Sequence, residues 1–362
     1  MPMRKKVLAF ISEAYRKASV YKEKKGYNAF VRDYYKKYKH KKFVFKRNIW
    51  SKNYFWDYFL QSLPHSMKSE YYIPADYYAF EIEPKLNTEF NCFCLEKNMF
   101  DRIFSNSGVK LPKTILRCIN GLYLDENYKR VESAKDLCSC IREDIIVKPT
   151  VQACGGKGIR KYLFADNVLH LYDKRCHEFA IDEVTACYKG NFIIQQVVNQ
   201  ASEVAKFHPF SLNTVRAFSY RSVKTNKTHV TIAMFRMGID GSYLDNASID
   251  GIACGLKENG YLMKYAFDQF GNYHSHHPNT KIKFENSRVP SFDRVVNAID
   301  RLADIIPHQR LVGWDFGIDE HKNPVLIELN VGTGTWMLQI ACGRPLFGDY
   351  SQEVKEYLDH TK

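Results

Sequence analysis

Two acidic residues, Asp315 and Glu328, lie in neighbouring segments with alternating apolar residues, joined by a short turn. Residues 311–319 and 324–330 read as the two strands of a β-hairpin. Their apolar face sets a register that places Asp315 directly opposite Glu328. Two bare carboxylates in this position, with β-carbons about 4.5 to 5.5 Å apart, repel each other and destabilise the sheet. The pair therefore indicates a ligand between the two acids.

Asn330 lies two positions beyond Glu328 on the same face of the predicted hairpin. Carboxylate and amide oxygens are hard ligands that suit Mg²⁺, and Mn²⁺ is a second candidate, so Asp315, Glu328 and Asn330 are predicted metal ligands. No His or Cys lies on this face, which argues against zinc. A shared proton, or two solvated acids, is the alternative interpretation. The same register predicts the apolar pairs Trp314 with Leu329, Phe316 with Ile327, and Ile318 with Val325.

Lys148 ends an apolar strand predicted at residues 145–149. A cation there is costly unless it meets an anion or water. The glycine run at residues 155–158 follows, and residues 161–164 read as a returning strand. Such a hairpin can close on phosphates through backbone N–H groups, although it is not a Walker A loop. An exposed lysine at the end of a plain hairpin is the alternative.

The elements around these residues predict an α/β protein. Residues 88–107 and 132–142 read as helices, and residues 111–116 as a short strand. Residues 73–87 have prolines near both ends and read as a connecting segment. Strands that alternate with helices are typical of the α/β class.

The net charge of +13 is concentrated at the N-terminus. Residues 1–50 hold 16 Lys+Arg against 3 acids, a surplus equal to the charge of the chain, so the remaining residues are neutral. Residues 1–48 predict a basic, aromatic amphipathic helix that either packs on the body or binds an anionic membrane. The absence of a base-reading motif argues against nucleic acid as a partner.

The apolar runs are too short for a membrane span or a signal peptide, so we expect a cytoplasmic protein, with peripheral attachment to the inner face of the membrane through the basic helix. The ten cysteines show no zinc spacing and are expected to be reduced thiols.

The lysine-ended strand, the glycine run and the late D…E-x-N pattern together resemble the ATP-grasp superfamily. The stretch from about Ile73 to Gln339 resembles its sugar-transfer-associated members, which are encoded among bacterial surface-polysaccharide genes, through EIEPKLN, EKNMFDRIF, IIVKPTVQACGGKGI and HPFSLNTVRAFSYR. The resemblance implies an ATP-grasp fold (α+β), in which two α+β subdomains hold the nucleotide between them. The expected parts are a basic helical extension (1–72), an N-terminal α/β subdomain (73–143), a lid subdomain (144–205) and a catalytic subdomain (206–362).

The resemblance also implies roles for individual residues. Superfamily members usually carry Glu where Gln195 stands, so this chain departs from the pattern at that position. The implied roles are Lys97 and Lys148 on the ATP phosphates, Gly155, Gly156 and Gly158 in the lid loop, Gln195 with the backbone of Gln196 and Val198 at the adenine, Glu203 at the ribose, Arg216 at the transferring phosphate, and Asn213 on the approach to it.

The acceptor side is less defined by the sequence. Asp245 and Asn246 match a similar pair in the substrate half of the family's cleft, although they also read as a plain turn. Thr333 and Gly334 follow the metal-binding strand, and their small size leaves room for a sugar. The three histidines at 274–277 lie in a Gly/Asn/Pro-rich loop whose spacing suits a substrate-facing or solvated loop better than a metal site.

The implied activity is an ATP- and Mg²⁺-dependent ligation of a carboxylate to an amine through an acyl phosphate. The expected substrates are a carboxylated sugar or glycan precursor and an amino acid or amine, in surface-polysaccharide biosynthesis. A phosphotransferase that uses the same cleft on a sugar hydroxyl is the alternative. A binding protein with a degenerate cleft is disfavoured, because the lysines, the two acids and Asn330 are all present.

Overall fold

The computed structural model of the chain describes residues 72–73, 78–88, 96–150, 156, 158–246, 251–268 and 272–361, and only the backbone of residues 80 and 174–176. Two predictions lie outside these residues, namely the basic helix at residues 1–48 and the position of Gly155 in the lid loop.

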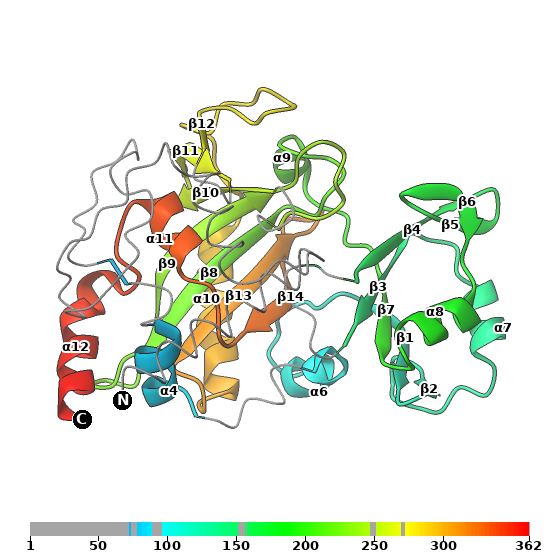
Figure 1. Ribbon diagram of the computed structural model, residues 1–362, viewed down its shortest axis with the longest axis horizontal. Coiled ribbons are helices and arrows are strands. Elements are labelled where there is room, and N and C mark those ends of the chain that lie inside the picture. The colour runs from blue at the N-terminus through cyan, green and yellow to red at the C-terminus, as the bar shows by residue number, and fades with distance from the viewer. Residues whose placement is uncertain are drawn as a thin grey trace, which may run out of the picture.

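The described part of the chain is built on two antiparallel sheets of seven strands each (Figure 1). The first sheet has the order β2-β1-β7-β3-β4-β5-β6. Helices α7 (Ala134–Ser139) and α8 (Ile181–Cys187) share a buried core with it. Its strands are β1 (Thr114–Ile119), β2 (Leu122–Leu124), β3 (Ile145–Pro149), β4 (Arg160–Ala165), β5 (Val168–Leu171), β6 (Lys174–Glu178) and β7 (Phe192–Gln196).

The second sheet has the order β12-β11-β10-β9-β8-β13-β14. Its strands are β8 (Thr214–Arg221), β9 (Thr228–Met237), β10 (Ile252–Leu256), β11 (Leu262–Phe267), β12 (Tyr273–His274), β13 (Leu311–Ile318) and β14 (Pro324–Asn330). Helix α10 (Phe292–Ile305) covers one face, and α11 (Trp336–Cys342) and α12 (Ser351–His360) cover part of the other (Figure 1). Helix α10 lies against the sheet because its apolar residues recur every three to four positions.

Alternation along β9 shows how this sheet separates its two faces. Ala233 and Phe235 enter the core under α10, whereas Ile232 and Met234 enter the core under α11. Side chains two residues apart on a strand share a face, so Arg236 lies on the α11 face of the sheet. The part of this face beyond α11 carries the polar residues of the candidate site.

Residues 78–86, which belong to the segment predicted as a connection, are helical, so the prediction was wrong for these residues. A π-helix (Tyr78–Ile82) and α4 (Glu83–Leu86) pack against the second sheet through the buried side chains of Tyr78, Ile82 and Leu86. Asn87 then accepts from the backbone N–H groups of Arg310 and Leu311 and donates to the carbonyl of Leu311, which ties the segment to β13. Pro84 lies in the first turn of α4, where its missing N–H costs no helical hydrogen bond.

The remaining predicted elements agree with the structure to different extents. The strand at residues 145–149 is confirmed as β3, β4 returns beside it, and the helix at 132–142 is confirmed as α7. The strand at 111–116 begins and ends three residues later, as β1. Within the predicted helix at 88–107, the structure describes a 3₁₀ turn (Lys97–Met99) and α6 (Phe100–Phe104). Two further short helices are α9 (Ser202–Ala205) and a 3₁₀ turn (Gly348–Tyr350).

The first sheet takes strands from both sides of the boundary expected at residue 143. Strands β1 and β2 precede this boundary, β3 to β7 follow it, and β1 pairs directly with β7. The division into subdomains at residues 143 and 205 therefore stays a prediction.

Cys118, Cys138, Cys140, Cys187, Cys254 and Cys342 are free thiols. In the part of the chain that the structure describes, no helix combines the length and the apolar character needed to cross a bilayer.

Candidate functional site

The hairpin of β13 and β14 places Asp315 opposite Glu328, as the sequence predicts, and Trp314 opposite Leu329. Beyond Asp315 the predicted register is wrong. A β-bulge leaves Ile327 without a partner on β13, so Phe316 pairs with Leu326 and Ile318 pairs with Pro324. The bulge retains the buried apolar face while it changes which residues of β14 face the cleft.

Ile327, the residue before Glu328, lines a small pocket of about 20 Å³. The pocket takes residues from both sheets and from the segment between them, so it lies at the cleft between the sheets. An apolar wall beside charged groups strengthens their electrostatic interactions with a ligand, because it excludes water. The lining residues are Lys97, Phe100, Asp101, Leu111, Pro112, Thr114, Arg117, Lys148, Gln195, Leu326 and Ile327.

Lys148 on β3 is a buried cation in this cleft, with 9% of its surface exposed. Its Nζ donates to Oε1 of Gln195 at 3.2 Å, which is a neutral partner. Burial lowers the pKa of Lys148 to about 8, since the favourable effect of Glu328 does not offset the desolvation. A buried ammonium group with a neutral partner is suited to bind an anion.

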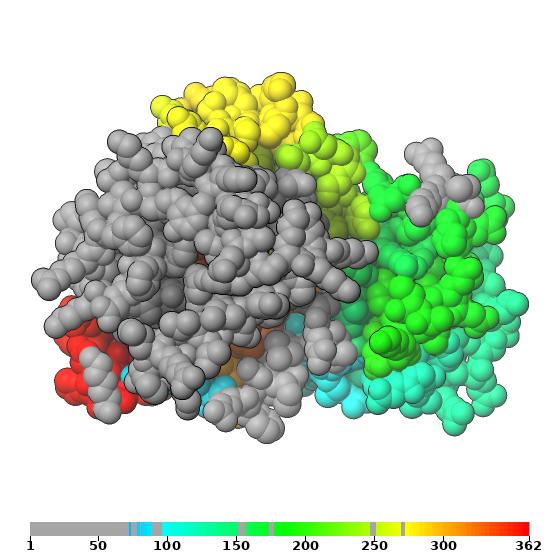
Figure 2. Space-filling model, viewed as in Figure 1, coloured from blue at the N-terminus to red at the C-terminus, as the bar shows by residue number. Residues whose placement is uncertain are grey.

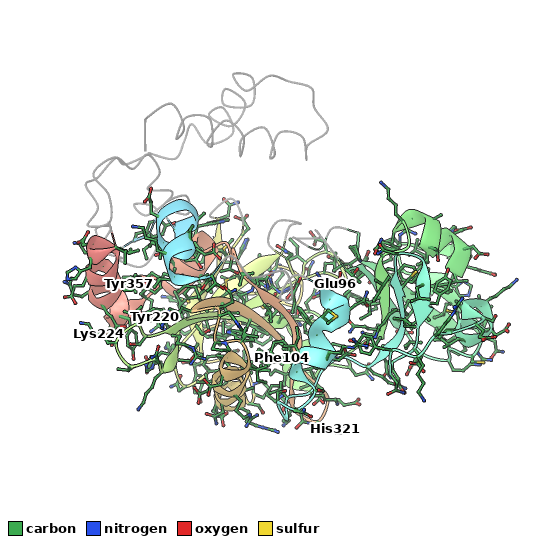
Figure 3. The ribbon with its side chains drawn as sticks, turned by 90° about the horizontal axis from the view of Figure 1, so that it is seen from below. Glu96, Phe104, Tyr220, Lys224, His321 and Tyr357 are labelled. Carbon is green, nitrogen blue, oxygen red and sulfur yellow. The ribbon has the colours of Figure 1, made fainter. Side chains whose placement is uncertain are left out.

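Lys97 reaches the same cleft from the segment between the sheets. Its Nζ lies 2.8 Å from Oε1 of Glu328. Glu96, labelled in Figure 3, accepts from the backbone N–H of Asn98 and so caps the 3₁₀ turn that carries Lys97. Lys97 and Lys148, predicted as a pair from the family resemblance, are thus brought together next to a predicted metal ligand.

Arg216 on β8 pairs with Asp315 across the sheet. Its Nε and Nη2 both donate to the carboxylate, the second at 2.6 Å, and Nη1 donates to Oγ1 of Thr333 at 3.0 Å. Burial alone would raise the pKa of Asp315, but Arg216 and Arg236 outweigh it and hold that pKa below its usual value. Three predicted residues, Arg216, Asp315 and Thr333, therefore form one contact group.

Arg236 on β9 belongs to this group and was missed from the sequence. Its Nη2 lies 3.3 Å from Oδ1 of Asp315, and its Nε lies 3.4 Å from Oδ2 of Asp245. Burial would lower the pKa of Arg236, but Asp245 and Asp315 raise it above its ordinary value. Arg236 could have been found from the sequence, because it is the one charged residue in the apolar run Ile232–Met237. The same pattern, a charged residue in an apolar strand, indicated Lys148 as a site residue.

The oxygen ligands of the site fit a magnesium ion in part. Asp315 accepts from two nitrogens of Arg216, contacts one of Arg236, and accepts from Nδ2 of Asn330 at 3.3 Å. A carboxylate has about four acceptor positions, so Asp315 could ligate a metal only if one donor left. Glu328 and Asn330 carry oxygens that suit the ion. Among the described residues, no three His, Cys, Asp or Glu side chains form a metal cluster, so phosphate or water oxygens would complete the coordination.

The predicted adenine strand is β7, next to β3 in the first sheet. Gln195 has its amide oxygen at Lys148 and its amide nitrogen 3.5 Å from Oγ1 of Thr114. The backbone N–H of Gln196 donates to the carbonyl of Lys113, so it is already used within the structure. Val198 follows the strand and is half-buried.

The two described glycines of the lid loop have a positive φ angle, a backbone conformation that glycine adopts more easily than any other residue. Gly156 has φ of 76° and Gly158 has φ of 75°. Residues with side chains would be strained at both positions, which explains the glycine pattern that the sequence shows.

Several predicted residues lie away from the lysines. The side chain of Asn213 is buried and bonded to the carbonyls of Val204 and His208, a structural role in a loop. Glu203 is half-buried and pairs with Lys322 in the β13–β14 turn. The carbonyl of Asn246 accepts from the N–H of Gly251, and Gly334 is exposed.

The loop after β9 contacts the first sheet through two tyrosines. Tyr172, between β5 and β6, donates to the carbonyl of Gly241 at 3.0 Å, and Tyr243 donates to the carbonyl of Ile159 at 2.9 Å. Their rings meet edge to face with centroids 5.2 Å apart. In Figure 2 the yellow-green atoms of this loop lie against the green atoms of the first sheet. The two sheets are therefore joined by the tyrosines as well as by the segment that carries Lys97.

The histidine loop has two kinds of residue. His276 is exposed, as expected for a solvated loop, but His277 is fully buried and bonds through Nε2 to the carbonyl of Gly238 at 2.9 Å. His277 lies beside His208, with ring centroids 5.7 Å apart. The expectation of a substrate-facing or solvated loop was thus wrong for His277, because burial and its carbonyl partner give it a structural position.

Acid is expected to destabilise the protein through His208. Burial, followed by the neighbouring His277, lowers the pKa of His208 to about 4, although Asp240 acts in the opposite direction. Between pH 6.5 and pH 4 the unfolded chain therefore binds more protons, so this stabilising contribution is complete above pH 6.5 and is lost as the pH falls. The loss should reach about 3 kcal/mol of unfolding free energy.

Urea unfolding of the protein and of His208→Asn at pH 7 and pH 4.5 would measure this contribution. The variant should lose less stability between the two pH values than the original chain. Equal losses would show that His208 does not titrate in this range.

Two antiparallel sheets with a lysine-lined cleft between them form the arrangement of the ATP-grasp class. Residues 78–356 match the family described as "Sugar-transfer associated ATP-grasp", and the chain belongs to this family. No curated protein sequence matches the chain.

The solved structures that are similar to the chain include the following three enzymes. The ATP-grasp ligase PsnB, complexed with minimal precursor, Mg and ADP, is 12% identical with a TM-score of 0.43, over 76% of this chain and 62% of that chain. VanG D-Ala:D-Ser ligase from Enterococcus faecalis is 12% identical with a TM-score of 0.44, over 76% and 63%. D-alanyl-alanine synthetase A from Vibrio cholerae is 11% identical with a TM-score of 0.44, over 76% and 67%. The chain thus spans less than two thirds of PsnB and VanG.

Proposed function

We propose that the protein is an ATP- and Mg²⁺-dependent carboxylate–amine ligase. The observation that supports this most is Lys148, a buried cation in the cleft whose hydrogen-bond acceptor, the amide of Gln195, is neutral. A nucleotide phosphate would supply the missing negative charge. Lys97, 2.8 Å from Glu328, would lie on the other side of the same phosphates.

The proposed reaction needs two steps. A carboxylate oxygen of the first substrate attacks the γ-phosphorus of ATP, and ADP leaves. An amine then attacks the carbonyl carbon of the acyl phosphate, an amide forms, and phosphate leaves while the amine loses a proton. Glu328 and Asn330 would hold a magnesium ion, which would supply charge neutralisation at the phosphates. Lys97 and Lys148 bind and orient the phosphates, and Ile327 excludes water from the pocket.

We propose a carboxylated sugar or glycan precursor as the acid substrate, which accepts the phosphoryl group, and an amino acid or amine as the second substrate. The family description, sugar-transfer associated, supports a sugar substrate. The surface-polysaccharide context and a membrane tether at residues 1–48 belong to the same proposal, supported by the sequence resemblance and by the basic composition of that segment.

Hydroxylamine trapping tests the proposed function. The protein is incubated with ATP, Mg²⁺, hydroxylamine and a panel of uronic acids, and hydroxamate and phosphate are measured. An acyl phosphate gives both products. A stable phosphorylated sugar without hydroxamate would instead establish a phosphotransferase and overturn the ligase proposal.

A further inference from the structure

Arg236 connects the two halves of the candidate site. Its guanidinium group lies 3.3 Å from Asp315 on β13 and 3.4 Å from Asp245 in the loop between β9 and β10. Its Nε and Nη2 also donate to Oγ1 of Thr214, at 3.0 and 2.7 Å. One side chain on the central part of the sheet thus contacts the metal-ligand face and the acceptor-side loop at once.

Thr214 completes this connection from β8. Its backbone N–H donates to Oδ2 of Asp245 at 3.1 Å, and its hydroxyl also donates to that oxygen. Because the same hydroxyl accepts from Arg236, Thr214 and Arg236 hold Asp245 from two sides. Two such partners restrict the carboxylate to one position more strongly than one partner does.

The charges of the group explain why arginine stands at position 236. With 8% of its surface exposed, Arg236 needs acidic partners, and Asp245 and Asp315 provide them on two strand-linked segments. A planar guanidinium group donates in several fixed directions, whereas a lysine ammonium group is a single point charge. Lysine could therefore contact one of the two acids without fixing their separation.

We propose that Arg236 is a positioning residue that fixes the acceptor-side loop, through Asp245, relative to the phosphate-transfer end of the site at Asp315. This inference rests on the proposed function and on the predicted position of Asp245 in the substrate half of the cleft, which together would place the acid substrate between these two ends. Arg236 acts through Asp245 and Asp315, and it sets the distance over which the acid substrate must reach the γ-phosphate.

The first test measures the loop without any acceptor. In the original chain, the amides of Ser242 and Leu244 are hydrogen-bonded inside the loop. Backbone hydrogen exchange at residues 239–246 should become about tenfold faster in Arg236→Met. Arg236→Met removes the charged partner of two buried acids, so a second variant is needed. Thr214→Val keeps the charges of Arg236 and Asp245 and removes only the hydroxyl between them, and it should also make exchange faster. Thr214→Ser retains the hydroxyl and should not.

The second test separates positioning from a general loss of structure. In hydroxamate formation, Arg236→Met and Arg236→Lys should raise the KM for the acid about tenfold and leave the KM for ATP unchanged. Arg221→Lys is the matched control, since Arg221 lies at the far end of β8 and pairs with the exposed Asp304. It should change neither KM.

The outcomes distinguish this inference from the proposed function. If the original chain forms no hydroxamate with any acid, the proposed function fails, and hydrogen exchange still decides the role of Arg236. If exchange at residues 239–246 is unchanged in both Arg236→Met and Thr214→Val, the positioning role is overturned. Equal increases in the KM for the acid and for ATP would also overturn it.

Discussion

Lys148→Met should weaken binding of ADP with Mg²⁺ by about a hundredfold, because a charge-assisted hydrogen bond to phosphate in a buried site is lost. Methionine has a similar shape without the charge. The variant should be at least as stable as the original chain, since burying the ammonium group costs free energy that methionine does not. Isothermal titration and thermal unfolding measure the two effects.

Lys161→Met is the matched control for this experiment. Lys161 lies on the neighbouring strand β4, is half-buried, and donates to the carbonyl of Phe210 at 3.4 Å, outside the cleft. It should bind ADP like the original chain. Equal affinities for Lys148→Met and the original chain would remove Lys148 from the nucleotide site.

The same lysine predicts the pH dependence of binding. With a pKa of about 8, Lys148 is mostly charged at pH 7 and mostly neutral at pH 9. Phosphate binds the charged form, so the affinity for ADP should fall about tenfold over these two pH units. Lys148→Arg, which stays charged, should show a flatter profile.

Glu328→Gln should reduce ATP turnover about a thousandfold and leave the fold intact. The carboxylate is a metal ligand in the proposed function and also pairs with Lys97, so its neutral amide loses both interactions. Its side chain is 30% exposed, so the exchange should cost little stability. ADP release at saturating ATP, together with a Mg²⁺ titration, measures the effect.

Glu320→Gln provides the comparison, because Glu320 lies in the turn of the same hairpin and is exposed. It should retain full turnover. Full ADP release by Glu328→Gln would remove the metal role from this carboxylate.

The pairing of Asp315 with Glu328 could be predicted because burial of the apolar residues fixes which side chains of the hairpin share a face. Trp314 and Leu329 must enter the core, so Asp315 and Glu328 must share the opposite face. The bulge could not be predicted. Leu326 and Ile327 are both apolar, so the pattern is the same whichever of them faces the core, and backbone pairing decided between them.

Two other features show where sequence patterns fail. Prolines suggested a connecting segment at residues 73–87, yet a proline in the first turn of a helix is compatible with helix, as Pro84 shows. Arg236 was overlooked because its partners, Asp245 and Asp315, are distant in the sequence and meet it only across the sheet. Pairing over such distances depends on the topology, which local spacing does not contain.

The bulge at Ile327 has a consequence for deletions in β14. Removing one residue from a buried strand ordinarily turns every side chain beyond it to the wrong face. Here Asp315 already pairs with Glu328, and Phe316 already pairs with Leu326, so removing Ile327 alone would leave a regular ladder on both sides. The chain can thus lose one residue in the middle of this hairpin and keep its strand pairing. The deletion would remove the side chain of Ile327 and with it the apolar wall of the pocket.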